Sequence, residues 1–124
     1  INEVPITLEL ILGYIFAPLA WFMGIPWSEA FAAGQLLGVK TALNEFVAYL
    51  YLSDSETYQL SEKSRLIMLY ALCGFANFSS VGILLSGMSA MVPERRKDLI
   101  SVSGKALWGA LLASCLTGFM VGIL

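Results

Sequence analysis

The chain has 124 residues, of which 58% are hydrophobic and only 13% are charged, with a formal net charge of −2. Soluble domains carry about 25% charged residues, and the mean hydropathy here is +0.78, so the composition predicts a membrane protein. Histidine is absent, which excludes Ser-His-Asp catalysis and the usual zinc sites. The sequence also lacks the basic stripe that is typical of nucleic-acid-binding proteins.

The first apolar segment runs from Ile6 to Ile25. Its central part, LILGYIFAPLAWFMGI, carries no charge. At about 1.5 Å per residue, the segment is long enough to cross a hydrocarbon layer of ~30 Å. We therefore assign residues 1–26 to a transmembrane helix. Because the chain starts at Ile1 without a methionine, we expect it to be a piece of a longer polypeptide.

Residues 27–52 form a second apolar segment with a polar centre. The stretches AFAAGQLLGV and FVAYLYL flank a patch that contains Lys40, Asn44 and Glu45. A charge at the centre of a membrane helix costs about 2.5–3.5 kcal/mol on insertion scales. The segment is either one span with a costly centre or two half-helices that form a re-entrant hairpin, which is tolerated where protein or a wet cavity covers the break.

The second half of the chain contains a polar loop at 53–64, an apolar run at 65–92, a basic loop at 93–102 and a last span at 103–124. The run at 65–92 contains GFANFSSVG, and this composition predicts a helix broken near its middle. The positive-inside rule places the basic loop in the cytoplasm. The loop at 53–64 is then external, whereas the direction of the first span depends on whether 27–52 crosses the membrane or turns back.

Several glycines lie within the segments 65–92 and 103–124. Gly118 and Gly122 have the spacing of a close helix-packing motif. We predict a packing role, and no chemistry, for glycines 82, 87, 109, 118 and 122.

Glu45 is the first candidate for a functional side chain, because ionisable residues inside a membrane are functional candidates by default. Its carboxylate can accept hydrogen bonds from a polar solute. The alternative is a structural ion pair with Lys40, although a spacing of five residues is poor for a direct pair on one helix. Lys40 could also extend its ammonium towards the membrane surface.

A second polar cluster contains Asn77, Ser79 and Ser80. Asn77 and Ser80 share a face if the backbone is helical, and an amide with a hydroxyl suits a hydroxyl-rich ligand. The alternative is that they satisfy the broken backbone or a neighbouring helix. Phe75 and Phe78 flank the cluster and could stack on a flat ligand or simply pack in the membrane. Two interrupted apolar segments with polar breaks are typical of a secondary-transporter site.

The stretch GVKTALNEFVAY, from Gly38 to Tyr49, resembles the signature of concentrative nucleoside transporters, G-x-K-x-x-x-N-E-F-V-A followed by an aromatic residue or Met. The stretch GFANFSS, from Gly74 to Ser80, is similar to the broken penultimate span of that family. The resemblance covers almost the whole chain and corresponds to the carboxy-terminal third of a bacterial member.

The resemblance implies a substrate site and its supporting residues. Glu45, Asn77 and Ser80 would hold the ribose hydroxyls, and Phe75 would lie against the base. Lys40, Thr41 and Asn44 would support the tip of the hairpin. No metal site is expected in this chain, because the family's sodium site lies in the upstream part.

The resemblance also implies the architecture: an all-α membrane protein with a scaffold transmembrane helix at 1–26, a re-entrant helical hairpin at 27–52 that opens to the outside, and a discontinuous helix at 65–92. The complete protein would be a homotrimer in the inner membrane. We expect cation-coupled nucleoside import by alternating access, with a substrate such as uridine. The coupling ion would be Na⁺ in preference to H⁺, without another cofactor.

Two other functions are weighed against this one. A small proton-coupled multidrug exporter could also use a membrane-embedded Glu, but such exporters carry it in the first span, whereas Glu45 lies in the second segment. An intramembrane enzyme is disfavoured because the chain has no histidine and no pair of aspartates within an apolar segment; Asp54 and Asp98 both lie in predicted loops.

Overall fold

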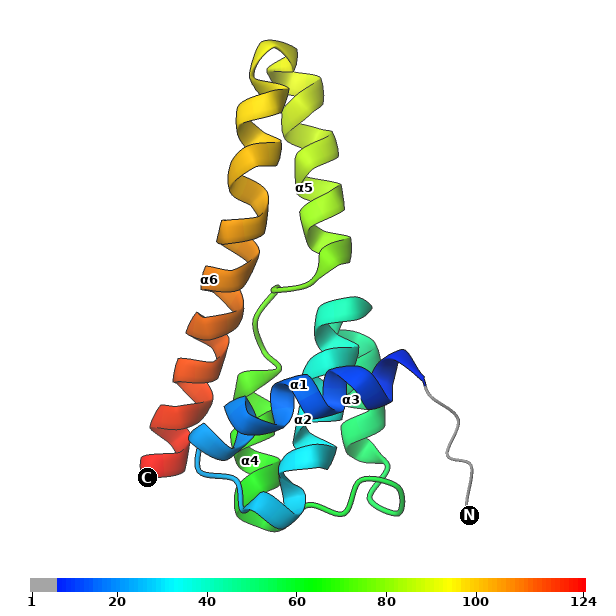
Figure 1. Ribbon diagram of the computed structural model, residues 1–124, viewed down its shortest axis with the longest axis vertical. Helices are drawn as coiled ribbons and strands as arrows, with labels where there is room; N and C mark the ends of the chain where they lie inside the picture. Colours follow the sequence, from blue (N-terminus) through cyan, green and yellow to red (C-terminus); the bar gives the residue numbers. More distant parts are fainter. Residues whose placement is uncertain (1–6) are drawn as a thin grey trace.

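The structure is a computed structural model that describes residues 7–124, and over that range it contains helices and no strands (Figure 1). The all-α prediction is confirmed. The first six residues of the predicted segment 1–26 lie outside the described residues. The elements in chain order are α1 (Leu8–Phe22), α2 (Trp27–Ala42), α3 (Glu45–Ser53), α4 (Glu62–Ala71), α5 (Phe78–Met91), the short 3₁₀ helix η1 (Pro93–Arg95) and α6 (Arg96–Ile123).

Side-chain caps determine where most of these helices begin. The N-caps of α1, α3, α4 and α5 are Thr7, Asn44, Ser61 and Asn77, and each accepts a hydrogen bond from a backbone N–H of the first turn. Such a cap stabilises a helix by about 1 kcal/mol. The two asparagines thus start a new helix after each polar break in the sequence, which explains why 27–52 and 65–92 each contain two helices.

The core lies where α1, α2, α4 and the second half of α6 pack together. Ala20, Ala33, Leu36, Ile67 and Leu72 are among its fully buried members. The turn between α1 and α2 depends on Gly24, whose φ of 99° lies in the region that only glycine adopts without strain. This turn lets α2 fold back along α1.

Helices α5 and α6 lie side by side and project beyond the core as a long hairpin (Figure 1). Among the described residues, one helical stretch, Pro93–Ile123, is long and apolar enough to cross a membrane. Large apolar side chains on both helices are exposed, including Ile83, Leu84, Met91 and Trp108. An apolar surface of this kind needs lipid or further protein to cover it.

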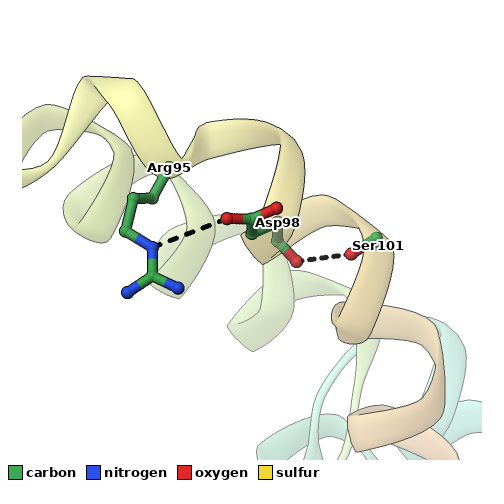
Figure 2. Close-up of polar contacts among 3 residues, drawn as sticks. All are labelled: Arg95, Asp98 and Ser101. Carbon is green, nitrogen blue, oxygen red and sulfur yellow. Dashed lines mark hydrogen bonds and ion pairs between the residues drawn. The ribbon is translucent and has the colours of Figure 1, made fainter.

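The loop end of this hairpin differs from the predicted loop at 93–102, because η1 and the first turns of α6 occupy it. Pro93 starts the 3₁₀ turn and Asp98 lies in the first turn of α6, which are favourable positions for Pro and an acidic residue. Arg95 Nε lies 3.5 Å from the Asp98 carboxylate, and the Ser101 hydroxyl donates to the Asp98 carbonyl at 2.7 Å. Figure 2 marks both contacts with dashed lines.

The glycine predictions have two outcomes. Gly118 and Gly122 lie against Met23, and a Cβ at Gly118 would come within 3.0 Å of the Ala71 side chain. Their predicted packing role is confirmed. A Cβ added at Gly82, Gly87 or Gly109 would meet nothing within 4 Å in the described part of the chain, so no packing role is seen for these three.

Candidate functional site

The two breaks in the helices meet at one place, and this place holds most of the predicted site residues. The first break, at Leu43 and Asn44, separates α2 from α3. The second, residues 72–77, separates α4 from α5 and is called the break segment below. In Figure 1 it is an extended, non-helical connection between the two helices. A hydrogen bond between Glu45 and Asn77 joins the two breaks.

Glu45 is the first residue of α3 and follows the cap residue Asn44, whose Oδ1 accepts from Val47 N at 3.0 Å. The carboxylate therefore lies at the positive end of a helix dipole, where an anion is stabilised. It is half-buried. Its Oε2 accepts a hydrogen bond from Asn77 Nδ2 at 2.8 Å, and its second oxygen remains available to a ligand.

Asn77 is nearly buried, with 2% of its surface exposed, and it uses both ends of its amide. Oδ1 accepts from Ser80 N at 2.7 Å and so caps α5, which fixes Nδ2 on the side of Glu45. An amide nitrogen carries two N–H groups, and only one of them is used by Glu45. The side chain is thus held by two bonds while one donor stays free.

Ser80 lies one turn into α5, beside Asn77. Its hydroxyl donates to the carbonyls of Phe75 and Asn77 at 2.9 and 3.0 Å, which belong to the break segment. Because its single proton is engaged there, Ser80 Oγ can act towards a ligand only as an acceptor. Ser79 is exposed, and its side chain does not take part in this arrangement.

Phe75 is 77% exposed and lies with Ser80 at a groove of about 430 Å³ between the break segment, α5 and α6. This volume falls within the range of ~300–1,000 Å³ that is usual for small-molecule sites. Ala106, Leu107 and Ala110 of α6 form the apolar wall opposite. Glu45 and Asn77 do not line this groove, which adjoins their pair at Ser80.

Of the residues that were predicted to support the hairpin tip, Asn44 lies in the first break, whereas Lys40 and Thr41 precede it at the end of α2. Lys40 is fully buried, with no exposed surface, and its Nζ donates to the Ala71 carbonyl at 3.0 Å. Thr41 is buried and donates to the Leu37 carbonyl within α2. Lys40 therefore does not extend to the surface. Arg95–Asp98 is the ion pair of the described residues, and it does not involve Lys40 or Glu45.

Three further contacts join α2 and α3 to α4 and its cap, and no sequence pattern indicated them. The Tyr49 hydroxyl donates to the Leu69 carbonyl at 2.8 Å, and Arg65 Nη1 donates to the Leu52 carbonyl at 2.6 Å. Glu29, at the start of α2, accepts from both the backbone N and the hydroxyl of Ser61 at 3.2 Å. All three link residues more than ten positions apart, which no local pattern reveals.

Gly74 was also missed as part of this site. A Cβ at Gly74 would overlap the Ser114 hydroxyl of α6 and would lie 3.7 Å from Lys40 Nζ. Glycine is therefore required for the close approach between the break segment and α6. The sequence signal was present in the GFANFSS stretch, but its partner on α6 could be found only from the fold.

Comparison with known proteins identifies relatives of the whole chain. Residues 1–122 match the family model described as Na⁺ dependent nucleoside transporter C-terminus. The nucleoside permease NupC of Helicobacter pylori is 42% identical over 122 residues, covering 95% of this chain and 29% of that protein. The putative nucleoside permease NupX of Escherichia coli is 45% identical over 125 residues, covering 94% of this chain and 30% of that protein.

The fold also resembles a solved structure. CNTnw in an inward-facing, substrate-bound state superimposes with a TM-score of 0.85 at 43% sequence identity, covering 94% of this chain and 29% of that one. The chain thus spans less than a third of the length of the proteins it matches.

Proposed function

Since the chain belongs to the family of Na⁺-dependent nucleoside transporters, as their carboxy-terminal region, we propose that the complete protein imports nucleosides through a site to which this region contributes one half. The protein is an integral protein of the plasma membrane, as its family is. Import would be driven by a coupled cation through alternating access. Sodium is favoured as that ion because the family description names it.

The observation that carries this proposal is the bond of 2.8 Å between Asn77 Nδ2 and Glu45 Oε2. It brings together two residues that lie 32 positions apart, each at the start of a helix that follows a break. Exposed helix ends of this kind are used by secondary transporters to bind substrate near the membrane midplane. The Glu45–Asn77 pair is thus the element around which we place the substrate.

A ribose diol fits the hydrogen-bonding groups of the pair. A hydroxyl can donate one hydrogen bond and accept others. One ribose hydroxyl would donate to the free oxygen of Glu45 and accept from the second N–H of Asn77. The neighbouring hydroxyl would donate to Ser80 Oγ. The exposed ring of Phe75 would lie against the base, and we propose uridine as a test substrate.

The architecture follows from the lengths of the helices. At 1.5 Å per residue, α4 and α5 are about 15 and 21 Å long, and each alone is shorter than a hydrocarbon layer of ~30 Å. We propose that residues 65–92 cross the membrane as a discontinuous helix and that 27–52 enters and leaves on the same side as a re-entrant hairpin. Residues 53–64 would be external, 93–102 cytoplasmic, and 103–124 the last span.

The remaining assignments concern assembly and support. The segment 1–26, which contains α1, would belong to a scaffold through which three copies assemble, and the later helices to a domain that carries the substrate across. Lys40, Thr41 and Asn44 would keep the hairpin tip in place. Membership of this family favours nucleoside import over a multidrug exporter, and the transport proposed here makes and breaks no covalent bond.

The test is uptake of labelled uridine by cells that express the complete protein carrying these residues. Sodium and proton gradients are varied separately for the wild type, Glu45→Gln and the control Glu56→Gln, whose side chain lies exposed in the loop. We expect uptake that one gradient drives, that Glu45→Gln lowers by at least ~10-fold and that Glu56→Gln leaves unchanged, because a hydrogen bond to a charged group contributes about 1.5–3 kcal/mol. Wild-type kinetics in Glu45→Gln would refute the site.

A further inference from the structure

The ammonium group of Lys40 occupies an unusual position, because it is completely buried, whereas the other charged residues whose burial the structure describes are exposed or partly exposed. It lies in the last turn of α2 and donates to the Ala71 carbonyl of α4 at 3.0 Å. A buried charge is costly unless it has well-placed partners. A lysine that only filled space here would be replaced at no cost by an apolar residue, so its charge calls for an explanation.

The explanation lies in the direction of the four helices that end or begin at the breaks. Helices α2 and α4 end there, at Ala42 and Ala71, whereas α3 and α5 begin there, at Glu45 and Phe78. A helix carries roughly half a negative charge at its carboxyl end and half a positive charge at its amino end. Two negative and two positive helix ends therefore face each other across the breaks.

One cation and one anion serve these four ends. Lys40 lies in the last turn of α2 and bonds the last residue of α4, whose own last turn has no basic residue. Glu45 lies in the first turn of α3 and bonds Asn77, the cap of α5, whose own first turn has no acidic residue. Lys40 thus compensates the partial negative charge at the ends of α2 and α4, and Glu45 the partial positive charge at the starts of α3 and α5.

Lys40 also contacts the residue just before the segment that carries Asn77. Its partner Ala71 is the last helical residue before the break segment, and Asn77 is the last residue of that segment. The other side of the segment is held by Gly74, which lies against Ser114 of α6 and close to Lys40 Nζ. The segment is fixed at Ala71, at Gly74 and at Asn77, and Lys40 contacts or adjoins the first two.

We propose that Lys40 is a positioning residue for nucleoside binding, whose ammonium group holds the carboxyl end of α4 so that the break segment presents Asn77 to Glu45. Lys40 does not touch the substrate. Its removal shifts Ala71 and the break segment away from the hairpin tip, so that the ribose hydroxyls lose their paired partners while the rest of the site stays. This inference rests on the proposed function.

The test compares two ligands in the purified complete protein. Binding of uridine and of 2′,3′-dideoxyuridine, which lacks both hydroxyls, is measured for the wild type, Lys40→Met and Lys63→Met. Methionine keeps most of the length of the side chain without its charge, and Lys63 is an exposed control at the start of α4. The ratio of the two affinities reports the contribution of the hydroxyls alone.

We expect Lys40→Met to weaken uridine binding by at least ~10-fold, which is the loss of about one charge-assisted hydrogen bond, and to bring the affinity ratio towards one. Lys63→Met should leave both affinities unchanged. A Lys40→Met protein that binds both ligands more weakly by the same factor, or that binds both normally, would overturn the inference. Absence of uridine binding by the wild type would instead refute the proposed function.

A second variant covers the case in which Lys40→Met does not fold. Lys40→Arg keeps a cationic donor for the Ala71 carbonyl, so it should fold and should still bind uridine more tightly than 2′,3′-dideoxyuridine. A Lys40→Arg protein that folds but binds the two ligands equally, or that fails to fold as Lys40→Met does, would overturn the proposed role.

Discussion

Reversing the polarity of the Glu45–Asn77 bond separates its role in the site from the helix cap that Asn77 also provides. Asn77→Asp keeps the cap, because Asp and Asn are about equally good N-cap residues. It replaces the donor Nδ2, now 2.8 Å from Glu45 Oε2, by an oxygen that cannot donate when ionised. Two carboxylates would then face each other across the breaks.

The size of this effect follows from Coulomb's law. Two unit charges 4 Å apart repel by about 4 kcal/mol at an effective dielectric constant of ~20. In the free protein, the half-buried Glu45 moves away and relieves the repulsion, and uridine, which contacts both side chains, must bring them back together. Binding that restored the full penalty would be weaker by roughly a thousandfold, since 1.4 kcal/mol is tenfold. The repulsion that persists in the free protein does not count, and we expect a loss of at least ~100-fold in uridine affinity for Asn77→Asp.

The double variant Glu45→Gln, Asn77→Asp restores the bond with donor and acceptor exchanged, and it keeps one negative charge at the pair. We expect it to bind uridine at least ~10-fold better than Asn77→Asp alone and to recover its melting temperature, because charge-assisted bonds are worth about 1.5–3 kcal/mol. Binding by the purified complete protein is the assay, and Thr7→Asp, an exposed cap of α1, is the control. Losses that simply add in the double variant would refute the reasoning.

Two further predictions concern regions outside the pair. Arg65→Gln removes the hydrogen bond to the Leu52 carbonyl and should lower the free energy of unfolding by about 1–2 kcal/mol, measured by thermal unfolding. The control Arg95→Gln should have almost no effect, because both side chains of the Arg95–Asp98 pair are 72% exposed. Equal effects of the two substitutions would argue against a stabilising contact between α3 and α4. In the loop, hydrogen bonds from Thr57 hold the pKa of Asp54 below its ordinary value. The stabilisation from these bonds is therefore complete above pH ~3.9, the pKa of Asp in the unfolded chain. It is lost as the pH falls through the lower pKa of the folded protein. The chemical shift of the Thr57 amide should therefore titrate with a midpoint at a lower pH than the pKa of an ordinary Asp. A midpoint at or above pH ~3.9 would contradict this.

The sequence predicted the helical class and the location of both breaks, because polar residues inside apolar runs are conspicuous in a membrane protein. Asn44 and Asn77 could be expected at helix starts, since asparagine is a preferred cap. The resemblance to a family, and not spacing, placed Glu45 and Asn77 at one substrate site, and their direct hydrogen bond was not predicted. No periodicity relates residues in different segments, so the pairing depended on how α3 and α5 are brought together.

The role of Lys40 shows why the remainder could not be predicted. Within its own helix, Lys40 suggests either a pair with Glu45 or extension to the surface, and the structure shows neither: its Nζ meets the Ala71 carbonyl, 31 positions away. The partner is a backbone atom, so no residue type marks it in the sequence. Ser114 opposite Gly74 and Arg65 beside Leu52 are alike in this respect, because each contact needs only a small side chain or a carbonyl at the right place.

In the proposed membrane location, backbone groups therefore offset the free-energy cost of the charges on Lys40 and Glu45 as much as side chains do. An isolated charge of either sign would be expensive in hydrocarbon, and a direct pair would compensate both while leaving the carboxylate engaged. Distributing them over opposite helix ends compensates each charge with dipoles and hydrogen bonds that are already fixed by the fold. The carboxylate of Glu45 then keeps an oxygen free, which the proposed contact with a substrate hydroxyl requires. An ion pair between the two side chains would satisfy the same electrostatic need and would block that proposed contact.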